Sequence, residues 1–290
     1  MLAPRAVLVT RPSELEQMLA RHGTRGQVEF FLRTRGRTLA QLDEAHDLLA
    51  DAVRTMSSAI PRDWRRASVS RPDLPTFAFT PEDVVIVVGQ DGLVANVAKY
   101  VDGQPVFGVN PDPRANAGVL VPMSPAVAAR ALVGRPELRS LTMARAVTDD
   151  GQELCALNEV FFGHPSHQSA RYALHQDGRM LPQSSSGLIA ATGTGATGWA
   201  ASILRERHSQ LPLPRPDERA LAWFAREPWP GPGLDADTTE GVVTSELVLT
   251  CTSDQLVLFA DGLENDRVVA TWGQDVRIGC AERSLLLAQP

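Results

Sequence analysis

Residues 83–99 read Asp-Val-Val-Ile-Val-Val-Gly-Gln-Asp-Gly-Leu-Val-Ala-Asn-Val-Ala-Lys, a β-branched run that stops at a glycine turn and then becomes helical. A continuous apolar run bounded by turn residues is typical of a strand buried on both faces, as in a parallel sheet covered by helices. Gly89 and Gly92 permit a tight turn, and the first amides of the helix offer donors to an anion. The stretch predicts a phosphate-binding turn, with an ordinary strand-to-helix turn as the alternative.

Asp91 lies between the two glycines. A carboxylate is a poor ligand for a phosphate because like charges repel. It suits a general base or a partner of magnesium instead. The position of Asp91 therefore favours chemistry on a phosphate compound over simple binding of one.

The composition narrows the class of protein. The 290 residues are 43% hydrophobic and carry a formal net charge of −6, which predicts a globular chain of one or two domains and disfavours a nucleic-acid partner. The three cysteines, Cys155, Cys251 and Cys280, lack metal-ligand spacing and favour a reducing compartment. No apolar stretch reaches membrane-spanning length, so we expect a cytoplasmic protein without a membrane partner.

The first part of the chain alternates strand and helix patterns, which predicts an open parallel sheet whose ligands lie beyond the carboxyl ends of its strands. The expected strands are residues 6–9, 28–32, 83–88 and 105–110, with a further one near the centre of 64–74. The expected helices begin near residues 12, 38, 91 and 125.

From residue 138 the pattern changes to short alternating runs with Asp-Gly turns, which is typical of antiparallel β structure. A small-residue loop runs into a helix over residues 193–204, and a proline-rich connection over 211–234 is expected to be a functional loop or lid. The predicted domains are an α/β domain over residues 1–136 and a β-rich domain over 137–290. The final residues are candidates for packing back on the first domain.

Three motifs occur in the order found in the NAD kinases: Gly89-Gln90-Asp91-Gly92, Asn158-Glu159 and the stretch from Thr192 to Trp199. Flanking residues 107–113, 156–163 and 185–188 resemble the divergent, mitochondrial-type branch of that family most closely. The resemblance covers most of residues 84–278, whereas residues 1–80 match only in general layout.

The resemblance implies a Rossmann-like amino-terminal domain, a carboxy-terminal β-sandwich and a nucleotide cleft between them. It also implies transfer of the γ-phosphate of ATP to the 2′-hydroxyl of the adenosine ribose of NAD or NADH, with Mg²⁺. A ribose hydroxyl is a poor nucleophile until its proton is withdrawn, which a carboxylate such as Asp91 can do. The remaining acceleration would come from positioning and charge neutralisation.

The family's binding residues transfer to matching positions of this chain. Asn158 and Glu159 match the pair that holds the ribose hydroxyls, and Thr197, Trp199 and Ser202 match positions that hold the adenine and ribose of NAD. Trp199 replaces the more common tyrosine and could stack on a base or fill the core. Gly89, Gln90 and Gly92 match the turn that binds the phosphate donor, and no residue is assigned as a metal ligand.

Two departures from the family pattern bear on activity. Gln90 replaces the second glycine of Gly-Gly-Asp-Gly, where a side chain restricts the backbone and could crowd the phosphate, and Leu93 replaces a threonine. A nucleotide sensor that has lost efficient transfer is therefore one alternative. A kinase of another hydroxyl is a second, because diacylglycerol kinases share a similar loop. The exposed strand edges expected in the β-rich half predict a homodimer.

Overall fold

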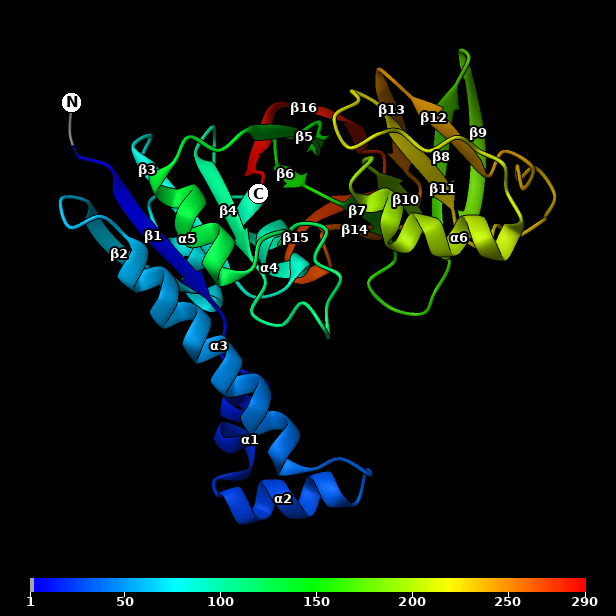
Figure 1. Ribbon diagram of the computed structural model, residues 1–290. Coiled ribbons are helices and arrows are strands. Elements are labelled where there is room, and N and C mark those ends of the chain that lie inside the picture. The colour runs from blue at the N-terminus through cyan, green and yellow to red at the C-terminus, as the bar shows by residue number, and fades with distance from the viewer. Residues whose placement is uncertain (1–2) are drawn as a thin grey trace. The chain divides into compact units, whose positions relative to one another are not determined.

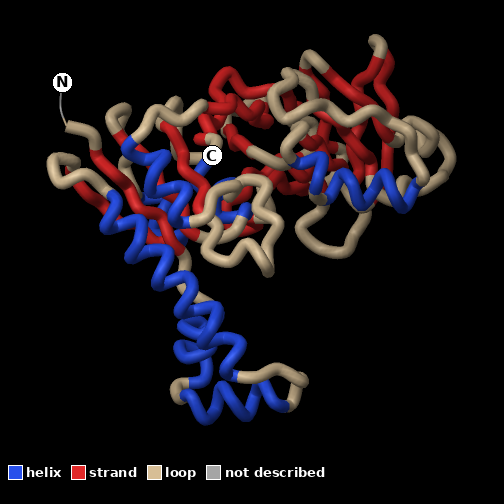
Figure 2. The backbone as a smooth tube through the Cα atoms, viewed as in Figure 1, coloured by secondary structure: helices blue, strands red, loops and turns tan. Residues whose placement is uncertain are grey.

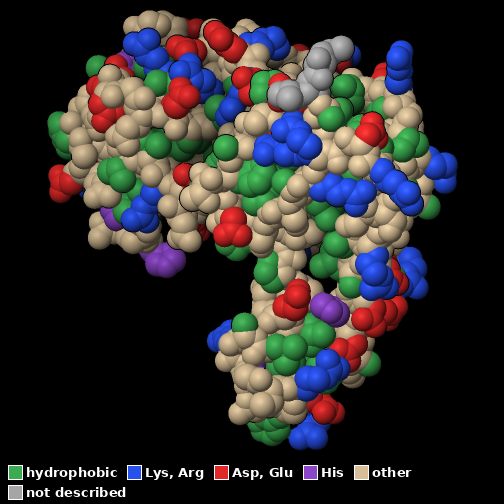
Figure 3. Space-filling view, turned by 90° about the vertical axis from the view of Figure 1, so that its left-hand side faces the viewer, with side chains coloured by type: hydrophobic (Ala, Val, Ile, Leu, Met, Phe, Trp, Pro, Cys, Tyr) green, Lys and Arg blue, Asp and Glu red, His purple; other side chains and the backbone are tan. Residues whose placement is uncertain are grey.

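The computed structural model describes residues 3–290, and the chain divides into two compact units (Figures 1 and 2). The first unit is Met1–Arg139 with Leu286–Pro290, and the second is Ser140–Leu285. No helix in residues 3–290 combines the length and the apolar character needed to cross a bilayer. On the face shown in Figure 3, basic and acidic side chains are interspersed.

The first unit is built on parallel strands in the order β2-β1-β3-β4, with the end of β16 beside β4. Its strands are β1 (Arg5–Thr10), β2 (Arg65–Ser70), β3 (Asp83–Val88), β4 (Pro105–Val109) and the last residues of β16 (Asp275–Ala288). Its helices are α1 (Glu14–His22), α2 (Arg25–Arg33), α3 (Leu39–Ala59), the 3-10 helix η1 (Arg71–Thr76), α4 (Asp91–Ala98) and α5 (Pro125–Val133).

The β-branched run of β3 is buried on both faces, as its sequence predicts. Ile86 and Val88 pack with Met56 of α3 and Leu132 of α5 in one apolar cluster. Val85 and Val87, which alternate with them, are fully buried as well. Strand β3 therefore leaves polar groups only at its ends.

Residues 28–32, which we predicted as a strand, lie instead in helix α2. The hydroxyl of Thr24 accepts from the backbone N–H of Gln27 and caps the helix. Val28 and Leu32, four residues apart, then share one face and pack against Leu15 and Leu42. In Figure 1, α1 and α2 project from the parallel sheet, and α3 connects them back to it.

The second unit is a β-sandwich. One sheet holds β16, β13 (Glu246–Cys251), β8 (Ala170–Gln176) and β9 (Arg179–Ser185), with β5 (Leu138–Thr148) pairing β16 and β6 (Glu153–Ala156). The other is six-stranded, in the order β12 (Glu240–Val243), β11 (Leu221–Ala225), β10 (Leu188–Ala191), β7 (Glu159–Gly163), β14 (Gln255–Ala260) and β15 (Leu263–Thr271).

The core of the sandwich is formed by inward-facing residues of both sheets, including Leu174, Leu249, Phe162 and Leu258. Helix α6 (Trp199–Arg207), preceded by the 3-10 turn η2 (Gly195–Thr197), packs Ile203 on the outer face of the six-stranded sheet. The Rossmann-like α/β unit followed by a β-sandwich is the fold class that the sequence predicts.

The proline-rich segment 211–234 is not a single loop, because β11 forms its centre. After β11 the chain covers the outer edge of β9, where the backbone amides of Trp229 and Asp235 donate to the carbonyls of Ser184 and Pro182 at 2.7 Å each. An uncovered strand edge would offer unpaired amides to another chain. This segment therefore covers the edge of the sheet at β9. The sequence did not predict strands β9 and β12.

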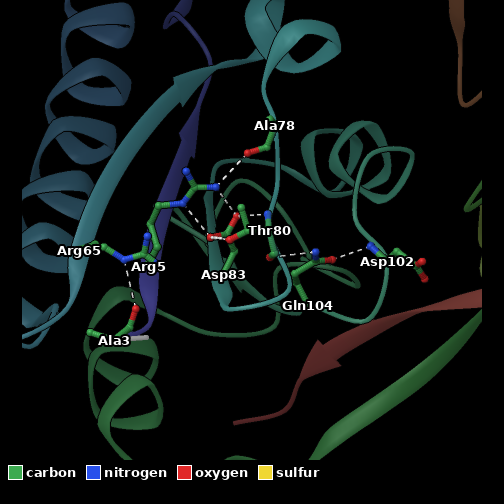
Figure 4. Close-up of polar contacts among 8 residues, drawn as sticks. All are labelled: Ala3, Arg5, Arg65, Ala78, Thr80, Asp83, Asp102 and Gln104. Carbon is green, nitrogen blue, oxygen red and sulfur yellow. Dashed lines mark hydrogen bonds and ion pairs between the residues drawn. The ribbon is translucent and has the colours of Figure 1, made fainter. Parts of the chain in front are cut away.

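A partly buried ion pair holds the amino ends of β1 and β3 together (Figure 4). The Asp83 carboxylate accepts from the Arg5 guanidinium at 2.7 Å through both oxygens and from the Thr80 amide and hydroxyl at 2.8 and 2.9 Å. Burial raises the pKa of Asp83, but the hydrogen bonds from Arg5 and Thr80 outweigh it, and the net direction is downward.

We expect Asp83→Asn to lower the free energy of unfolding by about 3 kcal/mol at pH 7, because it leaves the Arg5 charge partly buried without its partner. The pKa of Asp83 is lower in the folded chain than in the unfolded one. Its contribution is therefore present above about pH 4 and is lost as the pH falls through the folded value. Urea unfolding of both proteins at several pH values measures this.

The control is Asp51→Asn, which removes an exposed ion pair with Arg54 on α3. An exposed pair contributes about 1 kcal/mol or less. Equal losses in the two variants would contradict the assigned role of the Asp83 pair.

Candidate functional site

The carboxyl ends of β1 and β3 meet at the point where the strand order of the first unit reverses. From β1 the chain goes to β2 on one side, and it then returns to β3 on the other side of β1. In open α/β sheets, ligands bind outside the carboxyl ends of the strands at such a switch point. Arg11 follows β1 here, and Gly89, Gln90 and Asp91 follow β3.

The half-buried carboxylate of Asp91 holds the loop that follows β4. Its Oδ1 accepts from the backbone amides of Leu120 at 2.8 Å and Val121 at 3.1 Å, and its Oδ2 accepts from the amide of Val119 at 3.1 Å. A carboxylate offers about four acceptor positions, two on each oxygen. These bonds orient the group and leave an acceptor position on Oδ2 for a further donor.

Gly108 in β4 allows that loop to approach. A Cβ at Gly108 would lie 1.9 Å from the carbonyl oxygen of Leu120, which no backbone shift of a few tenths of an ångström relieves. The absence of a side chain at Gly108 therefore lets the loop come close enough to β4 for its amides to reach Asp91. Local sequence patterns do not reveal this loop, because its contact with Asp91 spans 29 residues.

Gln90 lies without backbone strain at the position that we matched to a glycine of the NAD kinases. Its φ of −105° and ψ of 165° lie in the extended region that any residue adopts. Its exposed side chain accepts from the Arg11 guanidinium at 2.6 Å and donates to the Asn116 Oδ1 at 3.2 Å. The backbone restriction that we expected from the missing glycine does not arise.

In the second unit, Asn158 and Glu159 lie where β6 passes into β7, and two other segments fix their backbone. The Asp261 carboxylate accepts from the amides of Leu157 at 3.0 Å, Asn158 at 2.7 Å and Glu159 at 3.4 Å. The carbonyl of Asn158 accepts from the amide of Thr192 at 2.9 Å. The Asn-Glu pair, the small-residue loop and the Asp261-Gly262 turn thus come together, although they lie far apart in the sequence.

Gly195 is needed for this packing, since a Cβ there would lie 2.2 Å from the carbonyl oxygen of Asn158. In the same loop, the hydroxyl of Thr192 donates to the Leu157 carbonyl at 2.6 Å. Thr194 is 5% exposed, and its hydroxyl oxygen has no hydrogen-bond partner among the described residues. The loop therefore combines a fixed backbone with an unused buried hydroxyl.

Burial raises the pKa of Glu159 to about 7, and the negative charge of Asp261 contributes to the shift. A carboxyl that changes its charge near neutral pH is typical of a functional site. In the unfolded chain the same group would ionise near pH 4.5. Keeping Glu159 at this position therefore costs stability at neutral pH.

Thr197 ends the 3-10 turn η2, and Trp199 and Ser202 lie in the first turn of α6. Thr197 and Ser202 are exposed. The half-buried Trp199 ring stacks on Phe161, with centroids 5.9 Å apart and planes 9° apart, and the Arg226 guanidinium lies 5.0 Å from its centroid. These rings line a pocket on the second unit together with Phe259, His164, Pro165, Val257, Glu264 and Arg267. Aromatic faces beside arginines suit a base bearing phosphate groups.

We expect Glu159→Gln to stabilise the protein at neutral and higher pH. A folded pKa above the unfolded one means that stability falls as the pH rises from about 4.5 to about 7. The amide removes that fall, so the variant should gain roughly 2–3 kcal/mol over the parent at pH 8 and almost nothing at pH 4. Chemical unfolding across this range measures it. The exposed Glu206→Gln on α6 serves as the control, and a pH-independent difference for Glu159→Gln would contradict the assignment.

Comparisons with known proteins leave the family unassigned at the level of sequence. No family model matches the chain, and no curated protein matches it. Among solved structures, it is similar to the crystal structure of an NAD kinase from Archaeoglobus fulgidus in complex with ATP, with a TM-score of 0.60 and 18% sequence identity. The match covers 98% of this chain and 93% of that chain. At this identity the similarity shows that the two chains share a fold.

Proposed function

We propose that this protein is an NAD kinase that transfers the γ-phosphate of ATP to the 2′-hydroxyl of the adenosine ribose of NAD or NADH. The observation that carries the proposal is the Asp91 carboxylate at the switch point of the parallel sheet, held by three amides with an acceptor position to spare. The shared fold with an NAD kinase in complex with ATP supports the choice of reaction.

In the proposed reaction Asp91 is the general base. Its Oδ2 accepts the proton of the 2′-hydroxyl as that oxygen bonds to the γ-phosphorus, while the bond to the β,γ-bridging oxygen breaks and ADP leaves. The amides of residues 119–121 fix the carboxylate before the substrate arrives, so less orientational freedom is lost in the reaction. The turn at Gly89–Gly92 would hold the phosphates of the donor.

Mg²⁺ would be held largely by the nucleotide itself. Within residues 3–290 no cluster of three or more His, Cys, Asp or Glu side chains forms a metal site. Mg²⁺ commonly keeps several waters and binds substrate phosphates, and the acceptor position left on Asp91 is assigned to the 2′-hydroxyl in the proposed reaction. When bound with ATP, Mg²⁺ would neutralise charge on the transferring phosphate.

Asn158 and Glu159 are proposed to bind the vicinal hydroxyls of the NAD ribose. An amide can donate and accept, and a carboxylate accepts, so together they complement two hydroxyl groups. Ionised Glu159 is the stronger acceptor, and its pKa of about 7 means that the group changes its charge near neutral pH. Thr197, Trp199 and Ser202 are the proposed adenosine contacts.

A nucleotide sensor without efficient transfer is the second candidate. The observation that favours it is the use of most of the Asp91 acceptor positions by the loop amides, which gives this carboxylate a structural role that requires no chemistry. Homodimer formation, a cytoplasmic location and closeness to the mitochondrial-type branch stay predictions from the sequence.

We expect purified protein with Mg²⁺, ATP and NAD to form NADP, and Asp91→Asn to lower kcat by about 10²- to 10⁴-fold, the usual contribution of a general base. The asparagine oxygen can keep the two bonds at the Oδ1 position, so the variant should remain folded. NADP is measured enzymatically, and Tm checks folding.

The control is Asp47→Asn, which changes an exposed carboxylate on α3 and should keep the parent's rate. Equal rates for the parent and Asp91→Asn would remove Asp91 from the mechanism. An inert parent that binds ATP would instead favour the sensor.

A further inference from the structure

Arg11 stands at the switch point with its charge uncompensated. Its guanidinium donates to the Oε1 of Gln90 at 2.6 Å. Within the part of the chain that the structure describes, this neutral amide is its only hydrogen-bond partner, and no carboxylate lies within ion-pair distance. Other arginines of the first unit, such as Arg25, Arg37 and Arg114, pair with carboxylates at 2.5 to 3.1 Å.

Gln90 can hold Arg11 in one orientation only. A guanidinium has donors and no acceptor, so the amide oxygen of Gln90 must face Arg11. That leaves the Nε2 to donate to Asn116 at 3.2 Å. The backbone carbonyl of Asn116 in turn accepts from the Asn110 side chain at 3.0 Å, at the end of β4. Asn116, in the loop after β4, therefore fixes the Gln90 amide, and the amide oxygen faces Arg11, which follows β1.

A neutral acceptor orients a guanidinium and leaves its positive charge available, whereas a carboxylate would cancel it. Arginine recognises phosphate through paired donors in a planar fork, and the bond to Gln90 occupies one side of that fork. The location adds to this argument, because Arg11 and Gln90 lie at the carboxyl ends of the two strands where ligands of open α/β sheets bind. A polyphosphate that binds at the carboxyl ends of β1 and β3 would find the Arg11 guanidinium already oriented.

We propose that Arg11 binds the phosphate groups of the donor nucleotide and that Gln90 is the residue that positions it. The inference rests on the proposed use of ATP, and it gives the side chain at the family's glycine position a function. In this proposal the phosphate is bound by the Arg11 side chain, which Gln90 holds in place. The phosphate then needs no close contact with the backbone of residue 90, so that position does not require glycine.

The test measures binding of ATP and of inorganic tripolyphosphate, separately, by calorimetry to the full chain. Arg11→Ala should weaken both by about 10- to 100-fold, the range for a charge-assisted hydrogen bond to phosphate. Gln90→Glu should weaken both to a similar degree, because the isosteric carboxylate forms an ion pair with Arg11. Arg33→Ala removes the same charge from α2, where the side chain lies over Phe30, and should bind as the parent does.

The positioning role of Gln90 is tested by a double-mutant cycle with Gln90→Ala. The single substitution should weaken ATP binding, and it should add almost nothing when Arg11 is already alanine. Arg11→Lys should restore part of the affinity. Tm values near that of the parent exclude loss of folding as the cause.

Binding of ATP by Arg11→Ala within twofold of the parent would overturn the proposal, as would fully additive effects of Arg11→Ala and Gln90→Ala. Failure of the parent to bind ATP or tripolyphosphate at millimolar concentration would overturn it as well. If the expected binding pattern appears but no NADP forms, the assignment of Arg11 stands and the proposed function falls.

Discussion

The close approach of the 119–121 backbone to β4 is the constraint on which the first unit's candidate site depends. It requires glycine at position 108, because any side chain there would collide with the Leu120 carbonyl. The approach brings three amides to the Asp91 carboxylate, and these fix a residue that would otherwise be the first, loosely held residue of a helix. The orientation of the proposed base is thus determined by a strand glycine and a loop, more than by its own turn.

In the second unit, too, a carboxylate that accepts from three backbone amides fixes the candidate site. The Asp261 carboxylate takes three consecutive amides and holds Asn158 and Glu159 where β7 begins. This arrangement places two acids close together, and the charge of Asp261 adds to the burial that raises the pKa of Glu159 to about 7. A chain selected for stability alone would have little reason to keep a carboxyl in that position.

Local patterns predicted the parts of the fold that local physics determines. The β-branched run of β3 and its glycine turn, and the apolar spacing of α3, are decided by residues close in sequence. Residues 28–32 were wrongly predicted as a strand because Val28, Phe30 and Phe31 have strand propensity. The Thr24 cap and packing against Leu15 favour a helix instead. The roles of Gly108, Asp261 and Arg11 depend on contacts between distant segments, which no periodicity reveals.

Gln90 illustrates why a motif residue has to be judged with its partners. As a departure from Gly-Gly-Asp-Gly, it suggests a damaged phosphate turn. In the folded chain its backbone is unstrained and its amide is fixed between Asn116 and Arg11. A glutamate of the same shape would neutralise Arg11, and an apolar residue would leave it unheld. Of side chains of this length, the amide alone keeps both the orientation and the charge of the guanidinium. The substitution therefore changes how an anion can be held at this edge of the sheet without removing the means to hold one.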